Sequence, residues 1–300
     1  MGEPQKSSQH DETRRGRQEI IVFLTLTFAL SSIFYTKIIA AGGLGDVGSG
    51  VITGLMWCPG IAALITRLAL ARDLAGLGWR PGKLRFLAAS YLTPLLYAAL
   101  AYGLVWLLSA GSFFDRDIIA KIADALSERK GWSFGSEAAV LGAYFLLIAT
   151  RGVFFGCISA LGEEIGWRGL LVPRLAETRS YTQTSWISGA IWAVWHWPLI
   201  LLAGYQGNSP AFSLATFTLM AVAASFIFAW LRLRSGSVWT AMLLHASHNA
   251  FIQNFFDPLT RTDGVAKYLT GEFGIATLAA VGLFAWLYWR RRGELVHHDT

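Results

Sequence analysis

The chain has 300 residues, of which 54% are hydrophobic and only 15% are charged. Soluble domains average about 25% charged residues, so this composition indicates a membrane protein. Long apolar runs recur in place of ten-residue alternating segments, which predicts an all-α membrane protein and not a β-barrel. The net charge of +6 is therefore interpreted through topology, and nucleic acid is not expected as a partner.

Residues 1–19 are polar, and we expect a disordered cytoplasmic tail there. Eight apolar runs follow, each long enough to cross a hydrocarbon core of about 30 Å. They lie at 20–41, 51–71, 86–110, 138–173, 185–204, 211–231, 237–256 and 273–289. Residues 20–290 are therefore predicted to form one polytopic membrane domain, followed by a second cytoplasmic tail at 291–300.

Lys and Arg residues gather in the tails and loops that share a side with the N-terminus, which predicts that both termini are cytoplasmic. The longest loop, 111–136, would lie outside, with a short surface helix near 118–129. The fourth run would be roughly 54 Å long as a helix, too long for one upright crossing. We expect a long tilted helix whose first turns project outside, or a break near Gly152 or Gly156.

Two adjacent carboxylates and an arginine lie within the fourth run, where charges are expensive and usually mark a site. Glu164 and Arg168 are four residues apart, so on a helix they share a face and can form an ion pair. Glu163 points about 100° away from Glu164. The spacing predicts a supporting Glu164–Arg168 pair and a separate Glu163 carboxylate that can act as a general base.

Two later runs carry ionisable residues. His196 is the only one in the fifth run, and Pro198 beside it is expected to weaken the helical ladder. In the seventh run His245 and Asn249 are four residues apart and share a face, and His248 lies between them. Counted from the predicted cytoplasmic ends, Glu163, His196 and His245 lie at one depth, roughly 12–17 Å. We therefore expect a polar catalytic cavity between helices four, five and seven that opens inward.

Two chemistries fit these residues. In the first, Glu163 and His196 activate a water, while His245 and Asn249 stabilise the oxyanion. In the second, Glu163, His196 and His245 bind Zn²⁺, whose bound water becomes the nucleophile. Both chemistries hydrolyse an amide bond.

Three motifs resemble those of the CPBP family of intramembrane proteases, which includes the CAAX prenyl endopeptidase and bacterial Abi-type proteins. They are Glu163-Glu164-x-x-x-Arg168, Trp192-x-x-x-His196 and His245-x-x-x-Asn249, in the family's order, within about 140–255. Trp192 stands where the family usually has Phe, and we expect a changed cavity shape without loss of activity.

The resemblance implies an eight-helix endopeptidase in which Glu163 activates water, His196, His245 and Asn249 complete the site, and Glu164 and Arg168 orient the helix. It also implies that no metal is required. The substrates would be peptides or proteins, either prenylated or membrane-bound, and the lipid bilayer is the other expected partner. The plasma membrane of a prokaryote is the expected location. The competing hypotheses are a non-catalytic immunity or scaffold protein and a proton-coupled transporter, although inverted repeats are not evident.

Overall fold

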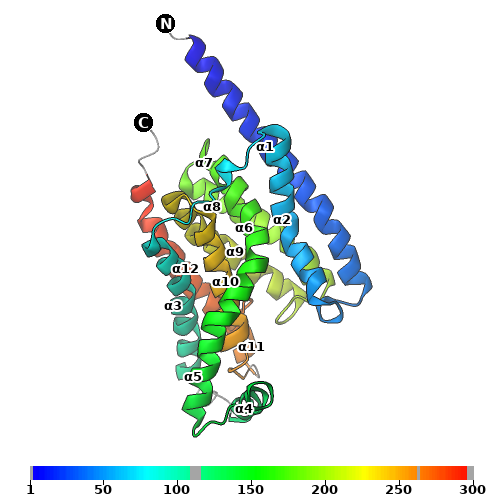
Figure 1. Ribbon diagram of the computed structural model, residues 1–300, viewed down its shortest axis with the longest axis vertical. Coiled ribbons are helices and arrows are strands. Elements are labelled where there is room, and N and C mark those ends of the chain that lie inside the picture. Colours follow the sequence, from blue (N-terminus) through cyan, green and yellow to red (C-terminus); the bar gives the residue numbers. More distant parts are fainter. Residues whose placement is uncertain (1–2, 109–115, 262–263, 296–300) are drawn as a thin grey trace.

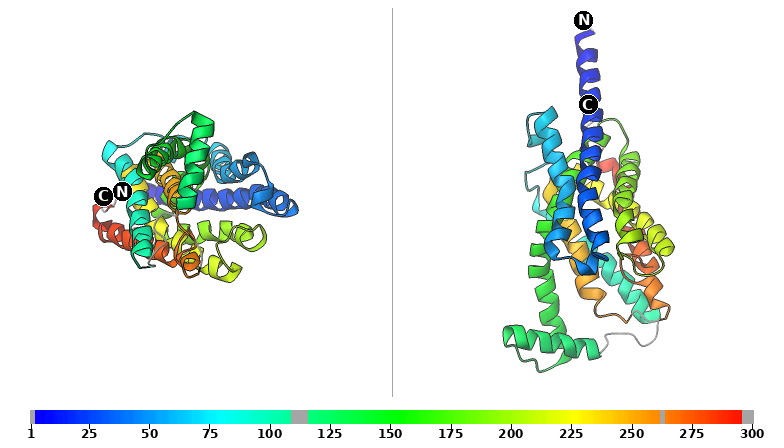
Figure 2. Two further views of the ribbon diagram at one scale, coloured as in Figure 1. Left: turned by 90° about the horizontal axis from the view of Figure 1, so that it is seen from below. Right: turned by 90° about the vertical axis from the view of Figure 1, so that its right-hand side faces the viewer.

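The computed structural model describes residues 3–108, 116–261 and 264–295, and no strand occurs among them. The helices form an elongated bundle in which both described ends of the chain lie at one end of the molecule (Figures 1 and 2). The long helices are α1 (Glu3–Ala40), α2 (Ser49–Leu70), α3 (Leu84–Leu108), α8 (Tyr181–Leu202), α9 (Pro210–Ser235), α10 (Val238–Phe251) and α12 (Ile275–Arg290). The fourth predicted run becomes α5 (Glu137–Leu147), α6 (Val153–Glu164) and α7 (Val172–Ala176), joined by π-helical turns at Ile148–Gly152 and Ile165–Leu171.

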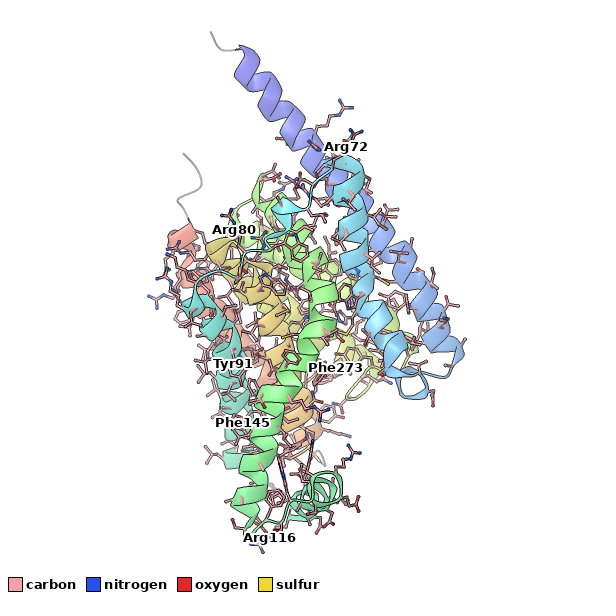
Figure 3. All side chains as sticks on the ribbon, in the orientation of Figure 1. Arg72, Arg80, Tyr91, Arg116, Phe145 and Phe273 are labelled. Atoms are coloured by element: carbon pink, nitrogen blue, oxygen red, sulfur yellow. The ribbon has the colours of Figure 1, made fainter. Side chains whose placement is uncertain are left out.

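All eight predicted runs contain helix, and six helices within the described residues are long and apolar enough to cross a membrane. The two runs that fall short are α10, which continues as a π-helical turn over Ile252–Phe256, and α12. Eight crossings and a cytoplasmic location of the termini therefore remain predictions. Arg72 and Arg80 lie toward the end of the bundle that holds the termini, and Arg116 lies at the opposite end (Figure 3).

The fourth run is the long helix that its length predicts. Residues Glu137–Ala176 form one continuous helical segment of 40 residues, and the π-helical turn at Ile148–Gly152 lies where a break was the alternative. Such turns keep the chain helical but widen it locally. The short surface helix expected in the preceding loop, 111–136, is also present, as α4 (Arg116–Lys130), which packs beside α5 at the end far from the termini (Figure 1). Residues 109–115 lie outside the described residues.

The N-terminal segment differs from the expected disordered tail. Residues 3–19 continue α1 as helix, and Glu19 at the expected tail boundary is fully buried. Its carboxylate pairs with Arg67 of α2 at 3.2 Å and with Arg174 of α7 at 2.8 Å. The helix persists because this buried network attaches the turn that contains Glu19 to the bundle. Composition alone does not reveal such contacts. Residues 1–2, 262–263 and 296–300 lie outside the described residues.

Local sequence signals explain where several helices begin. Ser180 and Gln183 form a capping box at the start of α8, satisfying two backbone donors. Gly236 ends α9 with φ of 70°, and Ser237 then caps α10 by accepting from the Trp239 backbone N–H. This tight connection places α9 and α10 next to each other, so that both helices contribute walls to one cavity.

Glycines bring α2 and α6 into close contact. A Cβ atom on Gly60 would lie 2.4 Å from the Gly162 carbonyl oxygen, and one on Gly166 would lie 2.6 Å from Pro59. Only glycine fits at such distances, and small residues are how membrane helices approach closely. The contact fixes the segment next to Glu163 against α2 and so determines where the carboxylates enter the bundle.

Candidate active site

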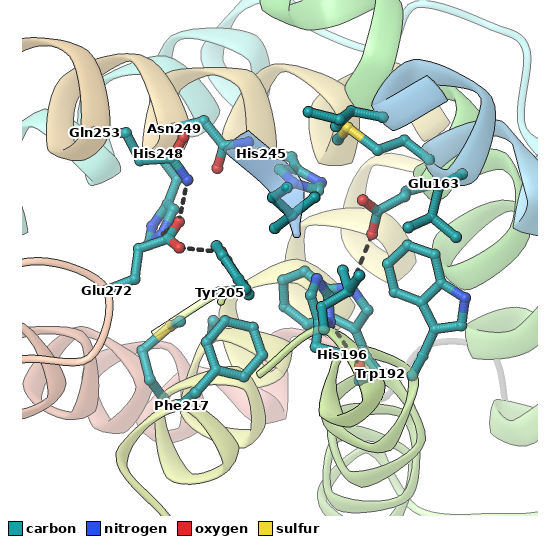
Figure 4. Close-up of a pocket in the computed structure, with 18 of the residues that line it drawn as sticks. Glu163, Trp192, His196, Tyr205, Phe217, His245, His248, Asn249, Gln253 and Glu272 are labelled. Atoms are coloured by element: carbon teal, nitrogen blue, oxygen red, sulfur yellow. Dashed lines mark hydrogen bonds and ion pairs between the residues drawn. The ribbon is translucent and has the colours of Figure 1, made fainter. Parts of the chain in front are cut away.

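A cavity of about 260 Å³ contains all four residues predicted to carry the chemistry. Glu163 enters it from α6, His196 from α8, and His245 and Asn249 from α10 (Figure 4). Helices α2 and α9, which were not expected to contribute, supply most of the apolar wall. The cavity therefore lies between the three predicted segments, with two further helices around it.

Glu163 is 2% exposed, and its Oε2 atom accepts two indole N–H groups. Trp192 Nε1 donates at 2.9 Å and Trp167 Nε1 at 3.3 Å. The carboxylate is thus separate from the ion pair, as its position on the helix predicts, but it has neutral donors that the motifs did not indicate. A buried carboxylate needs such hydrogen bonds to offset its desolvation.

The predicted ion pair between Glu164 and Arg168 is present and carries a third partner. Glu164 Oε1 accepts from Arg168 Nη1 at 3.0 Å and from His245 Nδ1 at 2.8 Å. Both carboxylate and guanidinium are buried, at 0% and 1% exposed. Glu164 therefore does more than orient its own helix, because it also determines how the ring of His245 is turned.

The guanidinium of Arg168 lies between two aromatic rings. Its Cζ atom is 4.4 Å from the Trp192 ring centroid and 3.9 Å from that of Phe228. Arg168 Nη2 also donates to Ser225 Oγ at 3.3 Å. This desolvated cation–π arrangement stabilises a buried charge and links α9 to the carboxylate-bearing helix.

His196 is held by its own helix. Its Nδ1 atom lies 2.9 Å from the Trp192 carbonyl oxygen, which can only accept, so Nδ1 carries the proton. The Nε2 atom then has a lone pair when the ring is neutral, and no hydrogen-bond partner for it exists among the described residues. The residue is a carbonyl-bonded core histidine on one side and a cavity-lining base on the other.

His245 and Asn249 face one cavity, as their spacing predicts. The Nδ1–H of His245 donates to the Glu164 carboxylate, which leaves Nε2 directed away from the ion pair. The side-chain amide of Asn249, which is partly exposed, makes no hydrogen bond to any described residue. Two groups from adjacent turns of α10 are thus available to a ligand.

A second polar group at the other end of the cavity was not predicted. The Glu272 cluster consists of Tyr97, Tyr205, His248, Gln253 and Glu272. Glu272 accepts from the Tyr205 hydroxyl and from Gln253 Nε2, and it pairs with His248 Nε2 at 3.5 Å. The other ring nitrogen of His248, Nδ1, lies 2.6 Å from the Tyr97 hydroxyl.

Within the Glu272 cluster, His248 contacts side chains from two other segments of the chain. The ring joins α3, α10 and the loop that follows α11 (Ala266–Leu269). Burial favours a raised pKa for Glu272, but the hydrogen bonds from His248, Tyr205 and Gln253 outweigh it and lower that pKa to about 2. The only sequence signal for this carboxylate is its place just before an apolar run.

The cavity extends beyond the candidate residues to the connections between several helices. Besides the candidate residues, it is lined by Leu44, Tyr205 and Glu272, from the connections between α1 and α2, α8 and α9, and α11 and α12. These loops also bind one another, since Leu44 N donates to the Ala203 carbonyl at 3.0 Å. The lining residues do not give the side on which the cavity opens, so the expected inward opening stays a prediction.

The residues proposed as a zinc set do not form one in this structure. Within the described residues, no group of three or more His, Cys, Asp or Glu side chains is arranged to hold a metal ion. His245 Nδ1 and His196 Nδ1 are both committed to oxygen acceptors, and Glu163 is held by indole donors. The Nε2 atoms of both histidines and Oε1 of Glu163 have no hydrogen bond to a described residue, so zinc binding by these three residues stays an alternative hypothesis, and no step is derived through a metal.

Comparison with known proteins agrees with the three motifs. The model of a family described as "Type II CAAX prenyl endopeptidase Rce1-like" matches residues 145–251. The match includes every motif residue and lies within the region that carried the resemblance. A comparison with curated proteins finds no match. The predicted resemblance is thereby confirmed for this region: the chain is a multi-pass membrane protein whose residues 145–251 form a CAAX protease-like core.

Proposed function

We propose that this protein is an intramembrane endopeptidase in which Glu163 and His196 activate a water molecule that hydrolyses a peptide bond. The observation that supports this most strongly is the set of unused donors and acceptors around one buried carboxylate. His196 Nε2 and the Asn249 amide have no partner among the described residues, although both line the same cavity as Glu163. Because both groups line the cavity and are not used by the protein, each is available to hydrogen-bond a water molecule or a substrate there.

The reaction requires one proton to move twice. Glu163 accepts a proton from water as the water oxygen bonds to the peptide carbonyl carbon, with His196 Nε2 accepting the water's other hydrogen bond. The carbonyl electron pair moves to its oxygen. That pair then returns to re-form the carbonyl, and the carbon–nitrogen bond breaks as the nitrogen takes the proton from Glu163, giving a carboxylic acid and an amine.

Asn249 and His245 would stabilise the oxyanion. The Asn249 amide donates in any state. His245 donates from Nε2 only as imidazolium, because its Nδ1 proton is already given to Glu164. The adjacent Glu164 carboxylate stabilises that cation, and this is the chemical reason for a carboxylate behind the histidine.

The substrate is proposed to be a peptide or protein that is prenylated or otherwise bound to the membrane. The family match supports this class, and the apolar wall from α2 and α9, including Leu55, Met56 and Met220, is suited to apolar side chains. We propose the prokaryotic plasma membrane as its location and no requirement for a metal.

Activity on a fluorogenic prenylated CAAX-type peptide tests the proposal. Purified wild-type protein should cleave it with or without o-phenanthroline, and Glu163→Gln should not. Inhibition by chelator that added zinc reverses would establish metal-dependent hydrolysis and overturn the proposed mechanism. If wild type does not cleave the peptide, substrates should be trapped in cells with Glu163→Gln. If wild type and Glu163→Gln recover the same uncleaved partners in equal amounts, the protein is a binding or scaffold protein.

A further inference from the structure

One residue contacts both groups that are proposed to activate water. The Trp192 indole N–H donates to Glu163 Oε2 at 2.9 Å, while its backbone carbonyl accepts from His196 Nδ1 at 2.9 Å. The carbonyl contact is available from any residue at this position. The indole contact depends on tryptophan, because phenylalanine, which the family motif usually has here, carries no donor.

The indole of Trp192 is packed among one guanidinium and three aromatic rings. Arg168 lies over its face, and the rings of His196, Phe228 and His245 meet it edge to face at centroid distances of 5.6, 5.6 and 5.7 Å. Trp192 is only 6% exposed. Its N–H is therefore fixed in direction, and so is the carboxylate that accepts it.

The two indole donors leave the two oxygens of Glu163 in different environments. Trp192 and Trp167 both donate to Oε2, and Oε1 has no hydrogen bond to a described residue. Holding one oxygen with donors from two helices orients the other oxygen. A general base must meet its proton within hydrogen-bond reach, so this orientation matters for the reaction.

We propose that Trp192 is a positioning residue whose indole N–H holds Glu163 so that Oε1 faces the water. The inference rests on the proposed function, since it assigns Glu163 as the base. It differs from a packing role because the ring and its N–H are separable. Phenylalanine would keep an aromatic face for Arg168 and the backbone carbonyl for His196, while removing only the donor.

The test compares three tryptophan-to-phenylalanine variants in the full chain. Trp192→Phe removes the 2.9 Å donor, and Trp167→Phe removes the 3.3 Å donor. Trp197→Phe is the control, because it lies on the same helix and its indole donates to Thr218 Oγ1 at 3.1 Å instead. The kcat and KM values for peptide cleavage are measured separately, with melting temperature in detergent.

Trp192→Phe is expected to lower kcat about tenfold with KM and melting temperature unchanged, because orientation of a base affects only the chemical step. Trp167→Phe should lower kcat less, and Trp197→Phe should not lower it. An unchanged kcat in Trp192→Phe, or a loss that follows KM or melting temperature, would refute the positioning role.

Infrared spectroscopy tests the same contact without any substrate. The carboxylate band of Glu163 is identified as the one lost in Glu163→Gln, and it should shift in Trp192→Phe but not in Trp197→Phe. A shift in a protein that cleaves no peptide would keep the contact and reject the proposed function. An unmoved band would reject the contact whatever the activity. If Trp192→Phe does not fold, ultraviolet resonance Raman spectra of wild type and Glu163→Gln are compared instead. The Glu163→Gln substitution should alter the signal of a strongly hydrogen-bonded indole N–H. Identical spectra would contradict the proposal.

Discussion

The two ends of the cavity use their polar groups differently. In the Glu272 cluster, the carboxylate is bonded to Tyr205 and Gln253 and paired with His248, which in turn meets Tyr97. At the Glu163 end, hydrogen bonds hold Oε2 of Glu163 and the Nδ1 atoms of His196 and His245. Oε1 of Glu163 and the Nε2 atoms of both histidines have no hydrogen bond to a described residue. Figure 4 shows Glu163 and Trp192 at one end, Glu272 and His248 at the other, and His245 between them.

This difference separates stability from chemistry. A fully bonded buried network rigidifies the structure around it, here two loops and two helices. Groups that are oriented but unpaired cost free energy in the resting protein and are useful only when a ligand supplies the missing partner. We therefore expect variants at the Glu163 end to lose activity more than stability, with the reverse in the Glu272 cluster.

The largest expected effect apart from Glu163 itself is at His196. His196→Ala removes the Nε2 lone pair that is proposed to hold the water, and general acid–base groups contribute typically about 10²–10⁴-fold. The expected kcat is lower by that range, with the melting temperature changed by only a few degrees. His248→Ala is the comparison, and kcat is measured for both. A larger kcat loss in His248→Ala would reverse the assignment of the two ends.

Glu164→Gln should lower both stability and activity. Removing one partner of a buried ion pair typically costs about 3–5 kcal/mol, because Arg168 would be left without its counter-charge, and the cation of His245 would lose its support. Thermal unfolding in detergent measures the change. Glu177→Gln is the control, since its pair with Arg174 is exposed and such pairs contribute little. A normal melting temperature for Glu164→Gln would contradict the supporting role.

Asn249→Ala should lower kcat about 10²–10³-fold with KM nearly unchanged, as removal of one oxyanion donor does elsewhere. The matched control is Gln253→Ala, one turn further along, whose amide is used by Glu272. Steady-state kinetics of the two variants would separate the roles. A rise in KM alone for Asn249→Ala would indicate substrate binding in the ground state instead of oxyanion stabilisation.

The smallest expected effect is a pH dependence of stability from the Glu272 cluster. The pKa of Glu272 is lowered from 4.5 to about 2 in the folded protein, so its contribution is complete above about pH 4.5 and is lost as the pH falls toward 2. The contribution is up to about 3 kcal/mol. Melting temperatures of wild type and Glu272→Gln should therefore differ by a constant amount between pH 5 and 8, then converge below 4.5. A difference that changes between pH 6 and 8 would contradict this.

The parts of the site that could be predicted follow from helix geometry. Glu164 and Arg168, or His245 and Asn249, share a face because residues four apart do so on any helix. Apolar run lengths likewise predicted a helix in each of the eight runs, and a long helix over the fourth run with a break near Gly152 or Gly156 as the alternative. These features depend on neighbours in the sequence, so one chain is enough to infer them.

The parts that could not be predicted depend on contacts between distant segments. Nothing near Glu163 in the sequence indicates that an indole 29 residues away donates to it. Glu272 reaches the cavity through a loop, whose path no periodicity describes. Trp192 was interpreted as a change of cavity shape because its motif position gives its helix face and not the direction of its N–H.

The central claim is that Glu163 performs the chemistry and Glu272, a buried carboxylate in the same cavity, does not. Peptidase activity of Glu163→Gln and Glu272→Gln, measured side by side on the prenylated peptide at pH 7, tests it most directly. Glu163→Gln should have no measurable activity while remaining folded, and Glu272→Gln should retain activity within about tenfold of wild type despite a lower melting temperature. Activity retained by Glu163→Gln and lost by a folded Glu272→Gln would contradict the account.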